Sequence, residues 1–397
     1  MQLKIADEAD NERLIQFFKN FPSEGWVRLQ ADRHPDFFSI YKLNSDRYLT
    51  YLLEDTKTHE VHGAASFVGK EVMLQGQKES VAFACDLRIS NHRRAVLQWS
   101  KHFLPTLYEA KLALEAKSIF AMINLSEAKA LNAFLTPRIK RPEFPVYHYF
   151  RQLSGVSVHG RFPWAKNLSE NIKIKHFTPA HEEELWNYLF KKNKNKDLSP
   201  FESVQHIGEF FNNHDTLDKE NFLIAYDKQD RIIGCTLPWS PRQFVELIPL
   251  SYDSRAQNFR QFLKFADTVG WARKLSQPAL NTKFSFLKKY LGIKSQILPT
   301  MARNPDSLNI KYLNYHAADS HYTHESLLDA AYFNCERGEF LYYMRDEGEI
   351  HLKCPRFWIG SEVKYGVFYL GQPNERLPSF LSQKARRIVS VDHPLLG

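Results

Sequence analysis

The chain has 397 residues, of which 43% are hydrophobic and 14% aromatic, and its formal net charge is +8. This length predicts two or three domains, and no apolar run approaches the roughly 18 residues that a membrane-spanning helix needs. The first residues show neither the basic nor the apolar region of a signal peptide, so we expect a soluble protein that stays in the cytoplasm.

The cysteines and the basic residues exclude several classes of site. Four cysteines are widely spaced and form no CxxC pair, which argues against a zinc site and a disulfide framework. Lysine and arginine are dispersed along the chain, and the run KKNKNK at 191–196 is typical of an exposed loop. We therefore expect reduced thiols, no metal and no nucleic-acid partner.

The first 153 residues alternate between strand and helix patterns. Apolar residues at helical spacing predict helices over 8–21, 95–116 and 126–135. Alternating or β-branched runs predict strands over 3–6, 47–55, 61–69, 79–90, 118–124 and 144–153. This order predicts a mixed α/β fold, in which helices cover the faces of a mixed, mostly antiparallel sheet.

Residues 154–171 lose this periodicity and gather Gly, Pro and Ser, so we interpret them as a linker. The first pattern then begins again. Strands are predicted over 172–178, 309–318, 340–346 and 356–371, a hairpin over 221–239, and helices over 181–190 and 323–339. The prediction is a tandem pair of α/β domains, 1–153 and 172–397, with a mostly helical insertion at about 240–305 in the second.

One short basic turn carries the strongest chemical signal. The stretch VAFACDLRISNHRRAVLQW, residues 81–99, passes from a strand through NHRR into a helix. A helix begins with unpaired N–H groups and the positive end of its dipole, and guanidinium groups add donors for phosphate oxygens. The turn therefore predicts a phosphate site at Arg93 and Arg94, although it holds no glycine that would let a pyrophosphate approach the backbone closely. The alternative is that both arginines only solvate the start of the helix.

The element order and the sequence DLRIS at 86–90 resemble the GNAT acyltransferase superfamily, and the tandem arrangement resembles its two-domain bacterial members. The resemblance implies an N-acyltransferase that takes its acyl group from acetyl-coenzyme A or another acyl-coenzyme A. The acceptor would be an amine on a small molecule or a peptide.

The same resemblance assigns candidate residues in three groups. The group for coenzyme A comprises Leu87, Arg88, Ile89, Arg93, Arg94, Ala95 and Asn124. Asp86 and Tyr147 are candidate catalytic residues, because the helix that follows Asn124 lacks the tyrosine which the family often places there. The segment DRHPDFF supplies the candidates for the acceptor side, Asp32, Arg33, Phe37 and Phe38.

Each candidate also has a structural interpretation. Tyr147 is also compatible with packing, Asn124 with capping of the next helix, and Phe37 and Phe38 with anchoring of a loop, and the sequence favours these structural interpretations. A histidine cluster at 316–324 has no nearby cysteine, so we interpret its polar neighbours Ser320 and Thr323 as candidate helix caps.

Two other functions stay open from the sequence. One is a binding protein that kept the fold and lost catalysis, since the glycine turn and the tyrosine are absent. The other is a Fem-type aminoacyl transferase, which pairs two such domains and uses charged tRNA. The basic chain fits that class, but the sequence shows no long helical arm in the second half.

Overall fold

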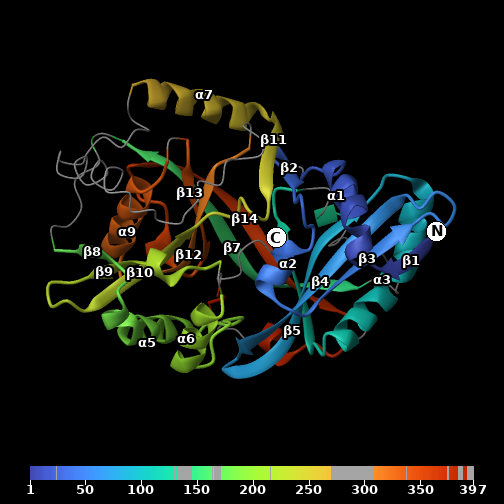
Figure 1. Ribbon diagram of the computed structural model, residues 1–397, viewed down its shortest axis with the longest axis horizontal. Coiled ribbons are helices and arrows are strands. Elements are labelled where there is room, and N and C mark those ends of the chain that lie inside the picture. Colours follow the sequence, from blue (N-terminus) through green and yellow to red (C-terminus); the bar gives the residue numbers. More distant parts are fainter. Residues whose placement is uncertain are drawn as a thin grey trace.

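The computed structural model describes residues 1–390 except 24, 128–130, 133–144, 163, 165–170, 215, 270–306, 337, 373–374 and 383–387, and within helices it leaves the side chains of 99, 100, 102–104 and 267 undescribed. The chain forms one twelve-stranded mixed sheet in the order β1-β3-β4-β5-β6-β14-β7-β13-β12-β10-β9-β8, with helices on its faces (Figure 1). Among the described residues, no helix has the length and apolarity to cross a membrane.

The N-terminal half supplies one end of the sheet. Its strands are β1 (Gln2–Ile5), β3 (Tyr48–Glu54), β4 (Val61–Leu74), β5 (Gln77–Ile89) and β6 (Ser118–Asn124). Its helices are η1 (Glu8–Asp10), α1 (Asn11–Lys19), α2 (Ser39–Asn44) and α3 (Arg93–Ala113). The apolar residues of α1 pack with Ile40 and Tyr41 of α2 in one core that includes Phe83 and Phe120, whereas α3 packs in a second core with Ala82 and Ile119. Neighbouring residues of β5 and β6 point to opposite faces, so the two cores lie on the two sides of the sheet.

The C-terminal half repeats this order at the other end of the sheet. Its strands are β8 (Lys173–His176), β9 (Leu223–Tyr226), β10 (Ile232–Trp239), β12 (Ile310–Ala318) and β13 (Phe340–Asp346). Its helices are η2 (Pro179–His181), α5 (Glu182–Asn193), α6 (Val204–Asn212), η3 (Lys219–Asn221), α9 (His321–Phe333) and η4 (Ile350–Leu352). In each half one strand pair is parallel, β5 with β6 and β12 with β13, and a helix, α3 or α9, connects the two strands of the pair.

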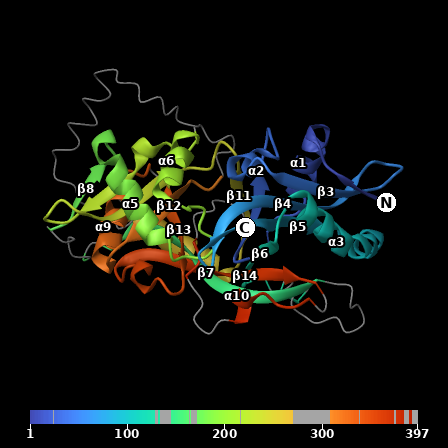
Figure 2. The same ribbon diagram turned by 90° about the horizontal axis from the view of Figure 1, so that it is seen from below.

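Two long strands hold the halves together. β7 (Val146–Arg161) and β14 (Trp358–Gly371) pair antiparallel along almost their whole length and cross the middle of the molecule (Figures 1 and 2). β14 comes from the end of the chain, yet it lies between β6 and β7. The helix α10 (Ser379–Ser382) follows it, and Phe380 packs against Phe120 and Phe150 of the N-terminal half.

The predicted linker is wrong over its first eight residues. Residues 154–161 belong to β7, where Ser154, Val156 and Val158 are buried. Glycine and serine in this stretch resemble a connector in composition, but β14 pairs with the strand as far as Arg161 and β13 pairs with its other edge as far as Val158, which supplies partners for its backbone. The sheet has no break between the halves, and the division into two domains stays a prediction.

Other differences concern elements whose partners are distant in sequence. β2 (Val27–Asp32) and β11 (Glu246–Tyr252) pair with each other in a separate two-stranded sheet, and neither strand nor α6 was predicted. β11 lies inside the predicted helical insertion, as does the helix α7 (Ser254–Thr268), while 270–306 is outside the described residues. Most of the predicted helix at 126–135 is also outside them.

Candidate functional site

The sheet opens between β5 and β6, directly beside the residues that the sequence marks as a phosphate site. The parallel ladder joins Val81–Ala84 to Ser118–Ala121 and ends there. From Cys85 onward, β5 continues to pair with β4, whereas β6 continues to pair with β14. The edge of β5 that faces the opening therefore presents backbone N–H and C=O groups without a ladder partner in β6.

A β-bulge changes the direction of β5 beside this opening. The register between β4 and β5 shifts between Ser66–Cys85 and Ala64–Arg88, so Asp86 and Leu87 stand opposite Ala65. Asp86 takes a left-handed backbone conformation with φ of 56°. This conformation is uncommon for a residue other than glycine, although aspartate tolerates it better than most. The bulge turns the Asp86 carboxylate toward α2.

Asp86 lies in a buried network with two residues from the segment between α1 and β3. Arg33 Nη2 donates to Asp86 Oδ1 at 2.9 Å, Arg33 Nη1 lies 2.8 Å from Oδ2, and the Tyr41 hydroxyl donates to Oδ2 at 2.6 Å. Burial alone would raise the pKa of Asp86, but the charge of Arg33 and the hydrogen bonds from Arg33 and Tyr41 lower it. A carboxylate with both oxygens engaged and a lowered pKa is better suited to positioning groups than to accepting a proton near neutral pH.

The start of α3 supplies the predicted arginines. Arg93 and Arg94 are exposed in its first turn, Ala95 is buried beneath them, and His92 precedes the helix without a side-chain cap. The first N–H groups of a helix have no partner inside it, so this end combines backbone donors with two accessible guanidinium groups. Val96 and Leu97 follow with roughly half of their surface exposed, 47% and 48%, and give the same end an apolar side.

Asn124 ends β6 on the other side of the opening. Its Oδ1 accepts hydrogen bonds from the backbone N–H and the hydroxyl of Ser126, so the side chain stabilises the following turn, as its capping interpretation expects. Its neighbour across the strand pair is Tyr365 of β14, whose hydroxyl lies 3.5 Å from that of Tyr342 of β13. Gly155 makes room for this tyrosine pair, since a Cβ there would lie 2.0 Å from the Tyr342 hydroxyl.

The structure separates Tyr147 from Asn124, at the end of β6. Tyr147 pairs with Leu370, and the preceding residue of β14, Tyr369, pairs with Phe120 near the beginning of β6, so Leu370 lies level with Ile119. From Ile119 to Asn124 a strand advances by roughly 16 Å. Burial raises the pKa of Tyr147, and its ring lies 6.4 Å from that of Phe368. These observations favour the packing interpretation of Tyr147.

Of the four predicted acceptor residues, three have structural roles. Phe37 and Phe38 have 0% and 3% exposure and pack in the core with Phe18 and Tyr48, which favours their anchoring role. Asp32 pairs with Glu246 in the β2–β11 ladder and accepts from the backbone N–H of His34. Only Arg33 reaches the bulge.

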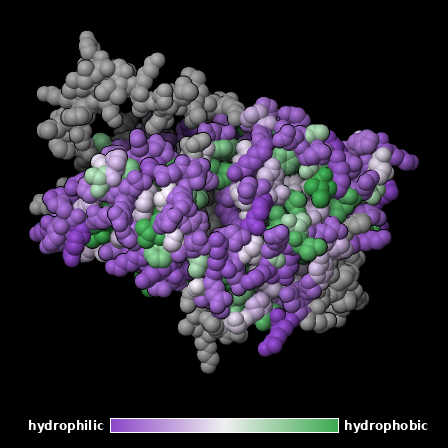
Figure 3. All heavy atoms as spheres, turned by 60° about the horizontal axis from the view of Figure 1, so that its bottom comes forward, coloured by the Kyte–Doolittle hydropathy of each residue, from purple (hydrophilic) through white to green (hydrophobic). Residues whose placement is uncertain are grey.

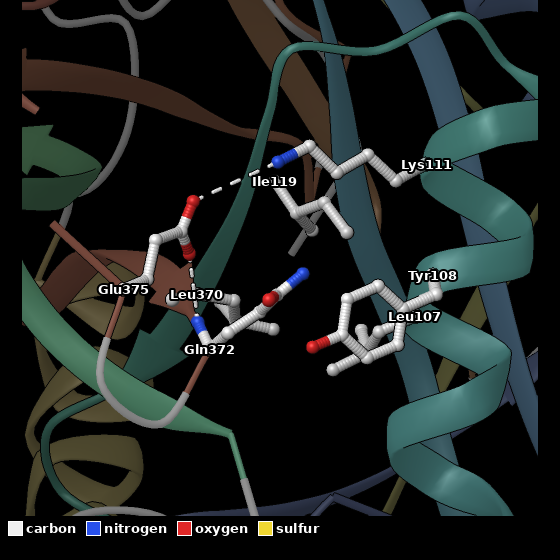
Figure 4. A pocket seen from close by; sticks show the side chains of 8 residues that line it. Leu107, Tyr108, Lys111, Ile119, Leu370, Gln372 and Glu375 are labelled. Carbon is white, nitrogen blue, oxygen red and sulfur yellow. Dashed lines mark hydrogen bonds and ion pairs between the residues drawn. The ribbon is translucent and has the colours of Figure 1, made fainter. Parts of the chain in front are cut away.

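A small pocket beside α3 is too narrow for an acyl group. It measures about 20 Å³, and Tyr108, Lys111, Gln372 and Glu375 surround it (Figure 4). Lys111 lies 3.9 Å from Glu375, which also accepts from the Gln372 backbone N–H. This volume suits about one water molecule.

The corresponding place in the C-terminal half has a different chemistry. The β10–β12 register shifts near Tyr315, whose φ is 50°, so a second bulge precedes α9 as the first precedes α3. Ser320 caps α9 by accepting from the Thr323 N–H. His316 Nε2 lies 2.7 Å from His324 Nδ1, and His324 Nε2 lies 3.2 Å from the Tyr343 hydroxyl, which donates to the Leu352 carbonyl. No arginine stands in the first turn of this helix.

The comparisons give a likeness to solved structures only. No model of a known family matches the sequence, and no curated protein does. N-myristoyltransferase of Saccharomyces cerevisiae, with bound myristoyl-CoA and inhibitors, is 11% identical with a TM-score of 0.49, and the match covers 94% of this chain and 81% of that chain. A GCN5-related N-acetyltransferase from Sphaerobacter thermophilus is 10% identical with a TM-score of 0.45, covering 83% and 82%. A probable N-acyltransferase from Enterococcus faecalis is 7% identical with a TM-score of 0.45, covering 94% and 73%.

At these identities and TM-scores, no family, function or residue role is carried over from these structures to this chain. Sequence reasoning missed Tyr41, Tyr342 and Tyr365. The only local signal for Tyr41 was its place in a helix pattern after DRHPDFF, and the other two lie more than 200 residues beyond Asn124.

Proposed function

We propose that the chain is an N-acyltransferase that takes its acyl group from an acyl-coenzyme A. The observation that carries the proposal is the opening of β5 from β6 beside the bulge at Asp86, with Arg93 and Arg94 exposed at the start of α3. The amide groups of a pantetheine arm can pair with the free edge of β5 as an added strand does. Phosphate groups fit the N-terminus of α3.

In this proposal, residues on the two sides of the sheet have different roles. Backbone N–H groups of β5 near Cys85–Arg88 can polarise a carbonyl placed in the opening. On the side of α2, Arg33 and Tyr41 hold Asp86 and thereby fix the bulge. The hydroxyls of Tyr342 and Tyr365 can hold or pass on a proton beside Asn124. A bound thioester would supply the activated acyl group.

Calorimetry with acetyl-coenzyme A and a long-chain acyl-coenzyme A tests the proposal. Arg93→Ala and Arg94→Ala should each weaken binding by about 1–2 kcal/mol, or roughly five- to thirtyfold, because each removes a charged donor to phosphate at an exposed site. Arg231→Ala, at a 74% exposed arginine in the β9–β10 hairpin, is the matched control and should change nothing. Absence of binding heat from both donors, or unchanged affinity in both variants, would exclude this site.

The same experiments distinguish the alternatives. Binding without release of free thiol from the donor in the presence of amines would favour a binding protein. Transfer that needs aminoacyl-tRNA and proceeds without coenzyme A would favour a Fem-type aminoacyl transferase. The acetyl group, the acceptor class and the cytoplasmic location remain predictions from the sequence.

A further inference from the structure

The outer side of α3 exposes apolar side chains to solvent. Leu97, Tyr108 and Leu112 have 48%, 40% and 81% of their surface exposed. The side chains that α3 buries in the core between helix and sheet are those of Ala95, Leu107, Ala110 and Leu114. Packing of the helix on the sheet therefore leaves the three exposed side chains available to something outside the chain.

The exposed apolar residues share one narrow side of the helix with Lys101. Successive residues of an α-helix are turned by about 100°, so positions 97, 101, 108 and 112 fall within a sector of about 60°. The buried positions lie on the opposite side of the helix. We call Leu97, Lys101, Tyr108 and Leu112 the outer line of α3, and all four are exposed.

The charge of α3 is strongly positive. The helix contains four Lys or Arg residues and one acidic residue, Glu109. Within the described part of the chain, Arg93, Arg94 and Lys101 take part in no ion pair, whereas Lys111 lies 3.9 Å from a carboxylate oxygen. Three cations at or beside the outer line are therefore available to an external partner.

The one acidic residue of α3 lies to the side of the outer line. Glu109 follows Tyr108, and one residue turns the helix by about 100°. Burial, and to a smaller extent the charge of Glu109, raises the pKa of Tyr51 in β3 to about 12. Tyr51 packs in the core beneath α3, so the Glu109 carboxylate lies on the flank toward β3. The outer line itself carries only positive charge.

A neighbouring strand extends the apolar surface. Ile5 of β1 is exposed and stands opposite Tyr51 in the ladder with β3. Leu3, two residues earlier, packs in the core beneath α3, so Ile5 points to the same side of the sheet. Hydrophobic side chains gather in Figure 3 on the N-terminal half of the molecule, where Figures 1 and 2 show α3. Apolar residues that gather on a surface mark interaction sites, whereas single exposed ones do not.

An apolar line among unpaired cations fits the surface of an anionic membrane. The outer line is the ridge of a helix and is therefore convex, and a fluid bilayer adapts its shape to a ridge. Leucine and tyrosine side chains enter the boundary between headgroups and acyl chains. Lysine and arginine beside them are attracted to negative headgroups. A nucleic acid would engage the cations and leave the leucines in water.

We propose that α3 binds the surface of a membrane that contains anionic lipids. Leu97, Tyr108 and Leu112 enter the headgroup region, and Lys101 lies against the negative headgroups. Lys101 lies beyond the first turn of α3, which the proposed donor site uses. The proposal does not rest on acyl transfer. Membrane binding is measured without a donor, so its failure and the failure of the proposed function are separate results.

Flotation of the full chain with lipid vesicles tests the proposal. Vesicles of phosphatidylcholine with about 30% phosphatidylserine should bind the chain, and vesicles of phosphatidylcholine alone should bind it at least tenfold more weakly. Raising the salt concentration from about 0.1 M to about 1 M should weaken binding at least fivefold, because the Debye length falls from about 10 Å to about 3 Å.

Substitution of the leucines tests the apolar part of the surface. Leu97→Ser and Leu112→Ser should each weaken binding roughly three- to tenfold, because each removes apolar surface from the headgroup region. Leu250→Ser in β11, at the same 48% exposure as Leu97, and Ile350→Ser in η4, at 66% exposure, are the matched controls. Both controls should leave binding unchanged.

Substitution of a lysine tests the charged part. Lys101→Glu should weaken binding roughly tenfold or more, since it reverses a charge at the lipid surface. Lys228→Glu, at an exposed lysine in the turn between β9 and β10, makes the same change in net charge at the other end of the sheet and should have a much smaller effect. Thermal unfolding of every variant should match that of the original chain, because each substituted side chain is exposed.

Four results would overturn the proposal. They are the absence of binding to anionic vesicles, equal binding to neutral and anionic vesicles, unchanged binding in both leucine variants, and equal losses in Lys101→Glu and Lys228→Glu. The last result would show that the net charge of the chain alone draws it to the vesicles. Binding of a DNA duplex that is lost in Lys101→Glu and kept in both leucine variants, without vesicle binding, would assign the surface to nucleic acid instead.

Discussion

At the scale of residues, the buried network around Asp86 determines the shape of β5. Arg33 and Asp86 are each about nine-tenths buried, and their side chains meet across 53 residues of sequence. Removing one partner of a buried ion pair leaves the other charge desolvated, which costs far more than losing a pair at the surface. Asp86 therefore contributes to the site through the backbone that it holds.

Asp86→Asn should lower the free energy of unfolding by about 3–5 kcal/mol, because Arg33 stays buried without its counter-charge. Asparagine keeps the shape of the side chain and tolerates the left-handed backbone at this position. Denaturant unfolding at pH 7 measures the change. Asp230→Asn is the matched control, since Asp230 has φ of 54° and lies in an exposed pair with Lys175, and its effect should stay below about 1 kcal/mol. Equal effects of the two substitutions would contradict the role of the network.

At the scale of elements, a histidine pair joins α9 to β12. Because the Tyr343 hydroxyl donates to Leu352, its oxygen accepts from His324 Nε2, so His324 Nδ1 accepts from His316 Nε2. This arrangement is the one that two neutral rings make. Burial lowers the pKa of His316 to about 3, with smaller effects from His351 and Lys196, and lowers that of His324 as well.

Stability should consequently fall in mild acid. The pKa of His316 in the folded chain is below the unfolded value of about 6.5. At a pH between these two pKa values, the unfolded chain therefore binds more protons than the folded chain. The free energy of unfolding should decrease by about 1.4 kcal/mol per pH unit for this histidine as the pH falls from about 6 to 4. Denaturant unfolding across this range should show a shallower slope for His316→Gln than for the original chain.

His176→Gln, at an exposed histidine of β8, is the control for that experiment and should leave the slope unchanged. A slope that is the same in His316→Gln and in the original chain would show that the pair is not neutral in the folded state. Carboxylates elsewhere in the chain also titrate between pH 6 and 4 and contribute to the slope of every variant. The contribution of His316 is therefore the difference in slope between His316→Gln and the original chain.

At the scale of the whole molecule, β14 makes the two halves depend on each other. It completes the sheet between β6 and β7, so the N-terminal half alone would expose the edges of both strands. Unpaired edges with apolar faces favour aggregation. A linker near residue 160 would give two independently stable fragments. The position of β14 instead predicts that the N-terminal half is not stable alone.

A fragment of residues 1–161 should therefore be insoluble or aggregate when expressed alone, because β6 and β7 each lack their partner. Co-expression with residues 172–397 should recover a soluble complex. Size-exclusion chromatography and thermal unfolding measure both outcomes. A monomeric 1–161 fragment that unfolds cooperatively would show that the N-terminal half is independent and that β14 is dispensable to it.

The sequence by itself determined most of the local structure and one part of the candidate site. Periodic apolar residues placed α3, β5, β6 and the C-terminal strands close to their observed bounds, because helix and strand patterns depend on neighbouring residues. Arg93 and Arg94 were predicted for the same reason, since the start of a helix is a local feature.

The tertiary structure decided everything that depends on residues far apart in the chain. Strand backbones pair through groups that every residue shares, so no local pattern indicates that β14 lies between β6 and β7, or that β2 pairs with β11. The contact of Arg33 with Asp86 depends on that pairing. The same pairing covers both edges of residues 154–158 and one edge of the residues up to Arg161, which is why a stretch with the composition of a linker is a strand at the centre of the sheet.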